Sequence, residues 1–271
     1  MNIVLIGAGN VATQLGSAFQ EKGFPVVQVY SRSWSAAETL GKKLQTNYTH
    51  QLQQIAPEAD VYVFSLKDAV LPEFLKTFPA VGGLWVHTAG SLPMAIFEAS
   101  AATRYGVFYP LQTFSKNREI SFEQIPIFTE ANHPADRQLL EQMASTLSGR
   151  VIPLSSEKRK YLHLAAVFAC NFTNHLYDLA AQILEDQAID WRVLLPLIEE
   201  TAAKVQEFSP KDAQTGPAVR SDLSVIEQQL EILKDDPEKR EIYRMLSRSI
   251  REIPNSVRND SSHCTNARHS E

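Results

Sequence analysis

Two glycines and an alanine near the start of the chain have the spacing of a dinucleotide-binding turn. Gly7, Gly9 and Ala12 follow a short apolar run, Ile3–Ile6, and lie at the start of an amphipathic stretch, Val11–Lys22. The first glycine of such a turn permits a tight bend, the second lets the backbone approach a pyrophosphate, and the small third residue lets helix and strand pack closely. The helix N-terminus then binds the phosphates. The expected contacts are Gly7, Gly9, Asn10, Val11 and Ala12.

No acidic residue follows the second apolar run, Val26–Tyr30. Enzymes that use NAD usually have Asp or Glu there to bind the ribose hydroxyls. Here Arg32 offers a guanidinium fork for a 2′-phosphate, between the hydroxyls of Ser31 and Ser33. Trp34 either stacks on adenine or packs beneath the second helix. The sequence therefore predicts NADP, rather than NAD, as the cofactor.

Polar residues follow two later apolar runs, Val61–Ser65 and Leu84–His87. Ligands of open α/β sheets bind outside the carboxyl ends of the strands. Lys67 and Asp68 fit a solvated helix start better than direct chemistry, whereas a His-Thr pair that ends an apolar strand has little structural reason. His87 is therefore also a catalytic candidate. The residues expected to line the nicotinamide half are Ser65, Leu66, Lys67, His87 and Thr88.

A helical pattern from Glu157 to about Asp186 carries the other candidates for chemistry. Hydride transfer needs a positioned acceptor carbon and usually a proton donor. His163 and Asn171 are eight residues apart, so we expect them to share a helix face about two turns apart. We expect His163 to donate the proton and Asn171 to orient the substrate, because a buried amide costs free energy unless it is paired. His175 fits a helix contact better.

The loop 209–220 is expected to close the substrate cleft. Thr215 in this loop is the fourth catalytic candidate. Arg220 and Lys116 are natural ligands for a carboxylate on a small-molecule substrate, although either fits an ordinary surface charge as well. His and Cys are scattered without the spacing of metal ligands, so no metal site is predicted.

The pattern of the whole chain indicates how these residues are positioned. Residues 1–153 alternate between short β-branched runs and amphipathic stretches, which predicts a doubly wound, mostly parallel α/β sheet of the Rossmann type. Residues 154–252 have helical periodicity and predict an all-α second domain for substrate binding and dimerisation. The polar tail, residues 253–271, is expected to be disordered.

Composition excludes several classes of partner. The 271 residues are 44% hydrophobic and carry a net charge of −5, which favours neither nucleic acid nor an anionic membrane. No uninterrupted apolar run approaches membrane-spanning length, and no secretory signal precedes the first strand. Cys170 and Cys264 lie in dissimilar surroundings, so no disulfide is expected. We expect a cytoplasmic protein.

These motifs resemble the superfamily of pyrroline-5-carboxylate reductase and 6-phosphogluconate dehydrogenase. A closer resemblance is to a bacterial family with a Rossmann-like domain and a C-terminal domain of unknown function, described as an NADP oxidoreductase and sometimes as deazaflavin-dependent. The similarity continues through Tyr109–Phe114, Tyr161–Asn171 and Thr215–Pro217. It implies a helical second domain and a homodimer built through it, which the wide apolar faces of the predicted helices also favour.

One feature of the superfamily is missing. Its hydroxyacid dehydrogenases have a catalytic lysine four residues before an asparagine that Asn171 matches, but Val167 stands in the lysine's place. The lysine chemistry is therefore not carried over, and the C-terminal signature of pyrroline-5-carboxylate reductases is also absent.

Two functions remain open at this stage. The first is an NADP(H)-dependent oxidoreductase that transfers a hydride to or from a small carbonyl, imine or hydroxy acid. The alternative is a non-catalytic NADP-binding or sensing protein. The missing lysine favours the second. The first is favoured by a polar set expected in a cleft between the domains: His87, His163, Asn171 and Thr215.

Overall fold

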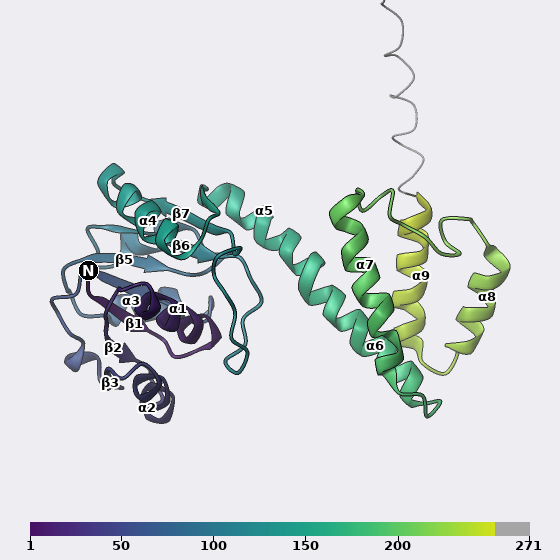
Figure 1. The fold of residues 1–271 in the computed structure, drawn as a ribbon, viewed down its shortest axis with the longest axis horizontal. Helices are drawn as coiled ribbons and strands as arrows, with labels where there is room; N and C mark the ends of the chain where they lie inside the picture. The colour runs from purple at the N-terminus through teal and green to yellow at the C-terminus, as the bar shows by residue number, and fades with distance from the viewer. Residues whose placement is uncertain (253–271) are drawn as a thin grey trace, which may run out of the picture. The chain divides into compact units, whose positions relative to one another are not determined.

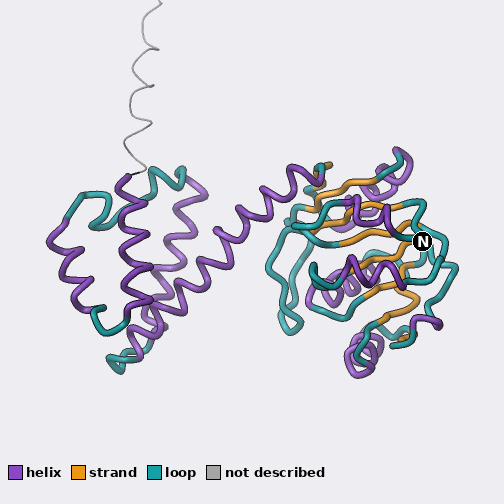
Figure 2. Tube along the Cα trace, turned by 180° about the vertical axis from the view of Figure 1, so that it is seen from behind, coloured by secondary structure: helices purple, strands orange, loops and turns teal. Residues whose placement is uncertain are grey.

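The computed structural model describes residues 1–252. They form two compact units, Met1–Thr173 and a second that begins at Asn174 (Figure 1). In the described chain all strands lie in the first unit, and the second is helical (Figure 2). The prediction of a disordered tail concerns residues outside the described range. None of the helices in the described range is long and apolar enough to cross a membrane.

The first unit is built on an eight-stranded sheet with the order β3-β2-β1-β4-β5-β6-β7-β8. Neighbouring strands are parallel except for the antiparallel pair β6 and β7. This confirms the predicted doubly wound, mostly parallel sheet. The strands are β1 Ile3–Ile6, β2 Val26–Tyr30, β3 Asn47–Thr49, β4 Val61–Phe64, β5 Leu84–His87, β6 Tyr105–Pro110, β7 Ile127–Ala131 and β8 Val151–Pro153.

The strand order reverses between β1 and β4. The chain runs outward from β1 to β2 and β3, and then returns to β4 on the other side of β1. A crevice forms outside the carboxyl ends of the strands at such a reversal, and ligands of this fold bind there. The turn after β1 and the segment after β4 are therefore the natural walls of a site.

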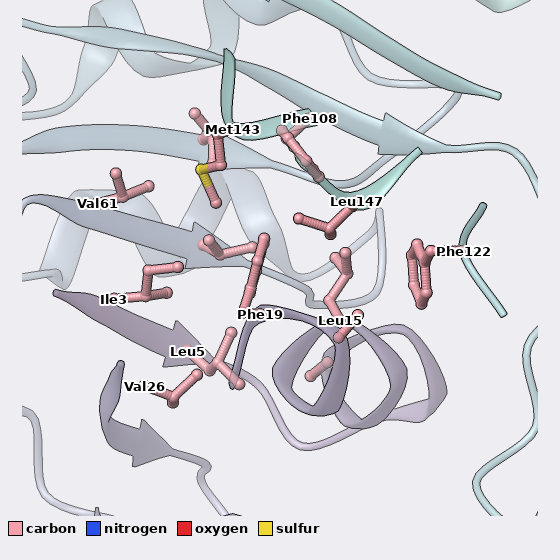
Figure 3. Close-up of a cluster of buried hydrophobic side chains, with 14 of the residues drawn as sticks. Ile3, Leu5, Leu15, Phe19, Val26, Val61, Phe108, Phe122, Met143 and Leu147 are labelled. Atoms are coloured by element: carbon pink, nitrogen blue, oxygen red, sulfur yellow. The ribbon is translucent and has the colours of Figure 1, made fainter. Parts of the chain in front are cut away.

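Side chains alternate between the two faces of the sheet along each strand. Both faces are therefore apolar, and helices cover both. On one face Leu5 packs in a cluster with Phe19 and Met143 (Figure 3). On the other face Ile6 packs in a cluster with Phe97. The helices of this part are α1 Asn10–Glu21, α2 Trp34–Lys43, η1 Leu52–Gln54, α3 Leu71–Thr77, η2 Met94–Ala99 and α4 Pro134–Leu147.

The predicted long helix, residues 157–186, contains a change of helix type. A π-helical turn, η3 Val167–Phe172, separates α5 Ser156–Ala166 from α6 Thr173–Glu185. The predicted domain boundary follows Pro153, where strands give way to helices, whereas the compact units divide at Thr173. The remaining helices are η4 Trp191–Leu194, α7 Leu195–Glu207, α8 Leu223–Ile232 and α9 Pro237–Glu252.

Candidate functional site

The glycine turn after β1 is held by its two neighbouring strands. Gly7 has a φ of +118°, a left-handed conformation that favours glycine, and a side chain at this position would collide with the backbone carbonyl of Ser65. The Gly7 N–H donates to the Tyr30 carbonyl at 2.8 Å. A Cβ at Gly9 would meet no protein atom within 4 Å. The turn is thus fixed on the protein side and open on the other, which fits a bound pyrophosphate.

Two side chains of α1 attach a distant loop to this turn. Asn10 Nδ2 donates to the Phe114 carbonyl at 2.8 Å, and Gln14 Nε2 donates to the Ser115 carbonyl at 2.6 Å. One of the two Nδ2 hydrogens of Asn10 is therefore used within the protein, and its backbone N–H lies at the N-terminus of α1, where phosphates bind in this fold. The predicted contacts Val11 and Ala12 lie in the first turn of the same helix, where Ala12 is fully buried.

The end of β2 presents Arg32 to solvent. Ser33 is the N-cap of α2, where its hydroxyl accepts a hydrogen bond from the Ala36 N–H. Trp34 is 49% exposed and packs edge-on against Tyr48 and His50. An exposed guanidinium at this strand end is accessible to a 2′-phosphate, and the role of Arg32 stays a prediction.

The ends of β4 and β5 are joined by side chains. The Thr88 hydroxyl lies 3.2 Å from the Ser65 hydroxyl, and Ser91 donates to the Asp68 carboxylate. Leu66 is half-buried, and Lys67 is exposed. The predicted nicotinamide-lining residues therefore lie together at one edge of the sheet, except for His87.

The structure encloses His87, one of the four predicted catalytic residues. Its side chain is fully buried and stacks on Phe97 with ring centroids 5.7 Å apart. Nδ1 accepts a hydrogen bond from the Ala89 N–H, and Nε2 lies near the Pro93 carbonyl without a hydrogen bond. Burial, aided by the charge of Arg159, lowers the pKa of His87 from 6.5 to about 3. A neutral, enclosed ring is poorly placed to donate a proton, so we assign His87 to the support of the turn after β5.

This burial predicts that the first unit loses stability in acid. The unfolded chain takes up a proton at His87 below pH 6.5, whereas the folded chain takes it up only near pH 3. The stabilisation is therefore complete above pH 6.5 and is lost as the pH falls towards 3. At about pH 5 the loss is about 2 kcal/mol.

The variant His87→Asn isolates this effect, because its amide oxygen can accept the Ala89 N–H but does not titrate. Urea unfolding at several pH values should show the stability difference between wild type and variant shrinking by about 2 kcal/mol from about pH 7 to about pH 5. A difference that stays constant with pH would show that His87 is not held neutral by the fold.

His163 contacts one residue of the sheet, Tyr109, and one residue of the loop after β5, Gly90. Its Nδ1 lies 3.1 Å from the hydroxyl of Tyr109 on β6, and the two ring planes are 71° apart. Gly90, in the loop after β5, lies against both rings, because a Cβ there would be 2.5 Å from His163 Nδ1 and 2.8 Å from Tyr109 Cζ. The structure thus brings the predicted proton donor to the loop that follows β5.

A buried ion pair fixes the start of α5, which carries His163. The Arg159 side chain is 1% exposed, and its Nη1 lies 2.6 Å from Glu130 Oε2 on β7. Its Nη2 donates to the Leu92 carbonyl at 2.7 Å. Glu130 also accepts from the hydroxyl and the backbone N–H of Ser156. Arg159 therefore joins the helix to β7 and to the loop after β5.

The π-helical turn places Asn171 on the same helix face as His163. Eight residues along a regular α-helix would leave the two side chains about 80° apart. A π turn contains one extra residue. The eight residues from His163 to Asn171 therefore rotate about the helix axis by as much as about seven α-helical residues, which is close to two full turns. The Thr173 hydroxyl donates to the Phe168 carbonyl, five residues earlier, across this wide turn. Asn171 itself is exposed.

The other predicted residues are not brought to this edge by the structure of the first unit. Thr215 and Arg220 are exposed residues of the second unit, in the loop between α7 and α8. Lys116 is exposed in the loop that α1 holds. Their roles stay predictions. No group of three His, Cys, Asp or Glu side chains that could hold a metal occurs in residues 1–252.

Comparison with known proteins adds family relationships to this geometry. Residues 2–84 match the family described as "NADP oxidoreductase coenzyme F420-dependent", and residues 125–250 match a domain of unknown function, DUF2520. A crystal structure from Bacteroides fragilis, described as a "putative NADP oxidoreductase", is 51% identical over 93% of this chain and 98% of that chain, with a TM-score of 0.88. The chain belongs to this NADP oxidoreductase family. The family and the NADP cofactor expected from the sequence are thereby confirmed.

More distant structures share the fold of this NADP oxidoreductase. A protein from Thermotoga maritima is 22% identical over 92% of this chain and 97% of that chain, with a TM-score of 0.67. A reductive aminase from Aspergillus terreus, in complex with NADPH and ethyl-5-oxohexanoate, is 16% identical over 93% and 94%, with a TM-score of 0.68. None of the curated proteins matches the sequence.

The sequence did not indicate that four residues surround His163 or anchor its helix: Gly90, Tyr109, Glu130 and Arg159. Gly90 and Tyr109 lie in segments that carried the family resemblance, but nothing in their spacing paired them with His163. Glu130 ends a β-branched run and Arg159 lies in a charged helix start, so each looks like a surface residue. Their pairing depends on strand and helix positions that only the fold defines.

Proposed function

We propose that this NADP oxidoreductase transfers a hydride between NADP(H) and a small carbonyl, imine or hydroxy acid, with His163 as the proton donor. The observation that supports this most strongly is the contact of His163 with Tyr109 beside Gly90. It brings a titratable side chain to the loop that follows β5, while the glycine turn and Arg32 mark the same edge of the sheet as the cofactor side.

Each group in the proposed site has a separate task. The open space at Gly9 and the N-terminus of α1 receive the pyrophosphate, and Arg32 binds the 2′-phosphate. The nicotinamide, when bound, supplies or accepts the hydride. His163 exchanges a proton with the oxygen or nitrogen of the substrate. Asn171, on the same face of the helical run, donates and accepts hydrogen bonds that orient the substrate.

Asn171→Ala should lower turnover by roughly 10- to 100-fold and leave NADP(H) affinity almost unchanged, because small misplacements of a substrate cost about that much in rate. Turnover is measured by NADPH absorbance with an acceptor found among carbonyls and imines. Affinity is measured by calorimetry.

Asn174→Ala is the matched control, since Asn174 is also exposed but lies three residues further along the helix. It should keep wild-type turnover. A loss of NADP(H) affinity in Asn171→Ala would place Asn171 in the cofactor site instead, and equal losses of turnover in both variants would make the effect merely structural.

We also propose a homodimer built through the helical unit. Large apolar side chains there are exposed, among them Leu197 at 63% and Ile232 at 76%. Exposed apolar surface of this extent is typical of interaction sites. Light scattering at micromolar concentration should give about twice 30.3 kDa.

Leu197→Asp, on α7, should shift this mass towards that of the single chain, because it places a charge in the apolar surface. Glu199→Gln, on the same helix, should leave the mass unchanged. A wild-type chain that scatters as a monomer at this concentration would refute the dimer.

A further inference from the structure

The Tyr109 hydroxyl is a buried group whose partner is a half-buried histidine. Tyr109 is 8% exposed, and its hydroxyl lies 3.1 Å from His163 Nδ1. Burial raises the pKa of Tyr109 above its usual 10, with Arg159 opposing this and Asp68 adding to it. The hydroxyl therefore keeps its proton at neutral pH and has one hydrogen to donate.

The direction of the hydrogen bond between Tyr109 and His163 decides which nitrogen of the neutral His163 ring carries the ring proton. Within the described residues Nδ1 of His163 is the hydrogen-bond partner of the Tyr109 hydroxyl. A neutral imidazole has one N–H and one bare nitrogen, and the bare nitrogen is the one that accepts. If Tyr109 donates to Nδ1, the ring proton is on Nε2. The neutral ring then offers a hydrogen-bond donor at Nε2 and not a base.

Gly90 provides the space in which the two rings meet. A Cβ at Gly90 would lie 2.5 Å from His163 Nδ1, closer than real Cβ contacts come. Gly90 does not have a left-handed φ, so glycine is needed there for space rather than for backbone freedom. Three separate segments, the loop after β5, strand β6 and helix α5, thus converge on one nitrogen of His163.

We propose that Tyr109 is a positioning residue that holds His163 with its proton on Nε2, and that this sets the site for reduction. The proposal rests on the proposed function. In the reductive direction the hydride from NADPH adds to the substrate carbon, and the electron pair of the C=O or C=N bond moves to the oxygen or nitrogen. That atom takes a proton from Nε2 of the protonated ring. The ring then holds its one remaining proton on Nδ1, which donates to the Tyr109 oxygen until solvent protonates Nε2 again. Loss of the Nδ1 proton to solvent restores the neutral Nε2–H ring, whose Nδ1 accepts from Tyr109.

The tautomer of His163 is measured directly by NMR on the full-length chain with ¹⁵N-labelled histidine, without cofactor or substrate. Two-bond proton–nitrogen correlations distinguish a proton on Nδ1 from one on Nε2. The chain has seven histidines, and the His163 signal is the one lost in His163→Gln. We expect wild-type His163 to be the Nε2–H tautomer when neutral, and Tyr109→Phe to lose this preference and give a mixture.

A second pair of variants separates this contact from general disturbance. Gly90→Ala should displace the His163 signal, whereas Gly82→Ala should not, because a Cβ at Gly82 meets no atom within 4 Å. A wild-type His163 with its proton on Nδ1, or a Tyr109→Phe variant with an unchanged tautomer, would overturn the proposal. Since the spectrum needs no turnover, it stays informative even if the hydride-transfer function proves wrong.

Discussion

Glu130→Gln should lower the free energy of unfolding of the first unit by about 3–5 kcal/mol, because it leaves the charge of Arg159 buried without its partner. The Arg159 side chain is 1% exposed, so water cannot replace the lost carboxylate. Urea unfolding, followed through Trp85 in the same unit, measures the change.

Glu73→Gln is the matched control for this ion pair. Glu73 pairs with Lys76 at 2.6 Å, the same distance that separates Glu130 from Arg159. The side chains of Glu73 and Lys76 are both more than half exposed. Exposed pairs contribute at most about 1 kcal/mol. If Glu130→Gln costs no more than Glu73→Gln, the buried pair does not anchor α5, and the position of His163 must have another cause.

Arg32→Ala should weaken NADP(H) binding by about 10- to 100-fold, because a hydrogen bond to a charged group contributes about 1.5–3 kcal/mol. NAD(H) lacks the 2′-phosphate, so its affinity should hardly change. Calorimetric titrations with both cofactors, for the wild type and the variant, give the four dissociation constants that are needed.

Arg137→Ala serves as the control for Arg32. Arg137 is also exposed but lies on α4, away from the end of β2. It should leave both affinities unchanged and so exclude a general effect of lowering the net charge. An equal loss for NADP(H) and NAD(H) in Arg32→Ala would contradict the assignment of the 2′-phosphate to Arg32.

The sheet could be predicted from the sequence where a strand is buried on both faces. The run Ile3–Ile6 is fully buried, and an uninterrupted apolar run reports such a strand directly. Strand β3, Asn47–Thr49, was missed because it is a three-residue edge strand, whose polar residues resemble a loop. Edge strands need little apolar surface, so their sequences carry a weak signal.

The site could be predicted only in part, because tertiary contacts decide the role of a side chain. His87 and His163 were both catalytic candidates, but one is fully buried and the other is half-buried against Tyr109. Nor does helical periodicity reveal the π turn at Val167–Phe172, since its residues suit an α-helix equally well. That turn improves the alignment of His163 with Asn171, which the sequence spacing predicted for a regular helix.

NADPH consumption over a panel of small ketones, keto acids and cyclic imines, with NADH in parallel, tests directly whether this chain transfers a hydride. We expect at least one acceptor for which each NADPH consumed yields one reduced product, with NADH much slower and with turnover reduced in Asn171→Ala. A chain that binds NADPH tightly but consumes none with any acceptor would contradict it. That result would identify an NADP-binding protein without hydride transfer.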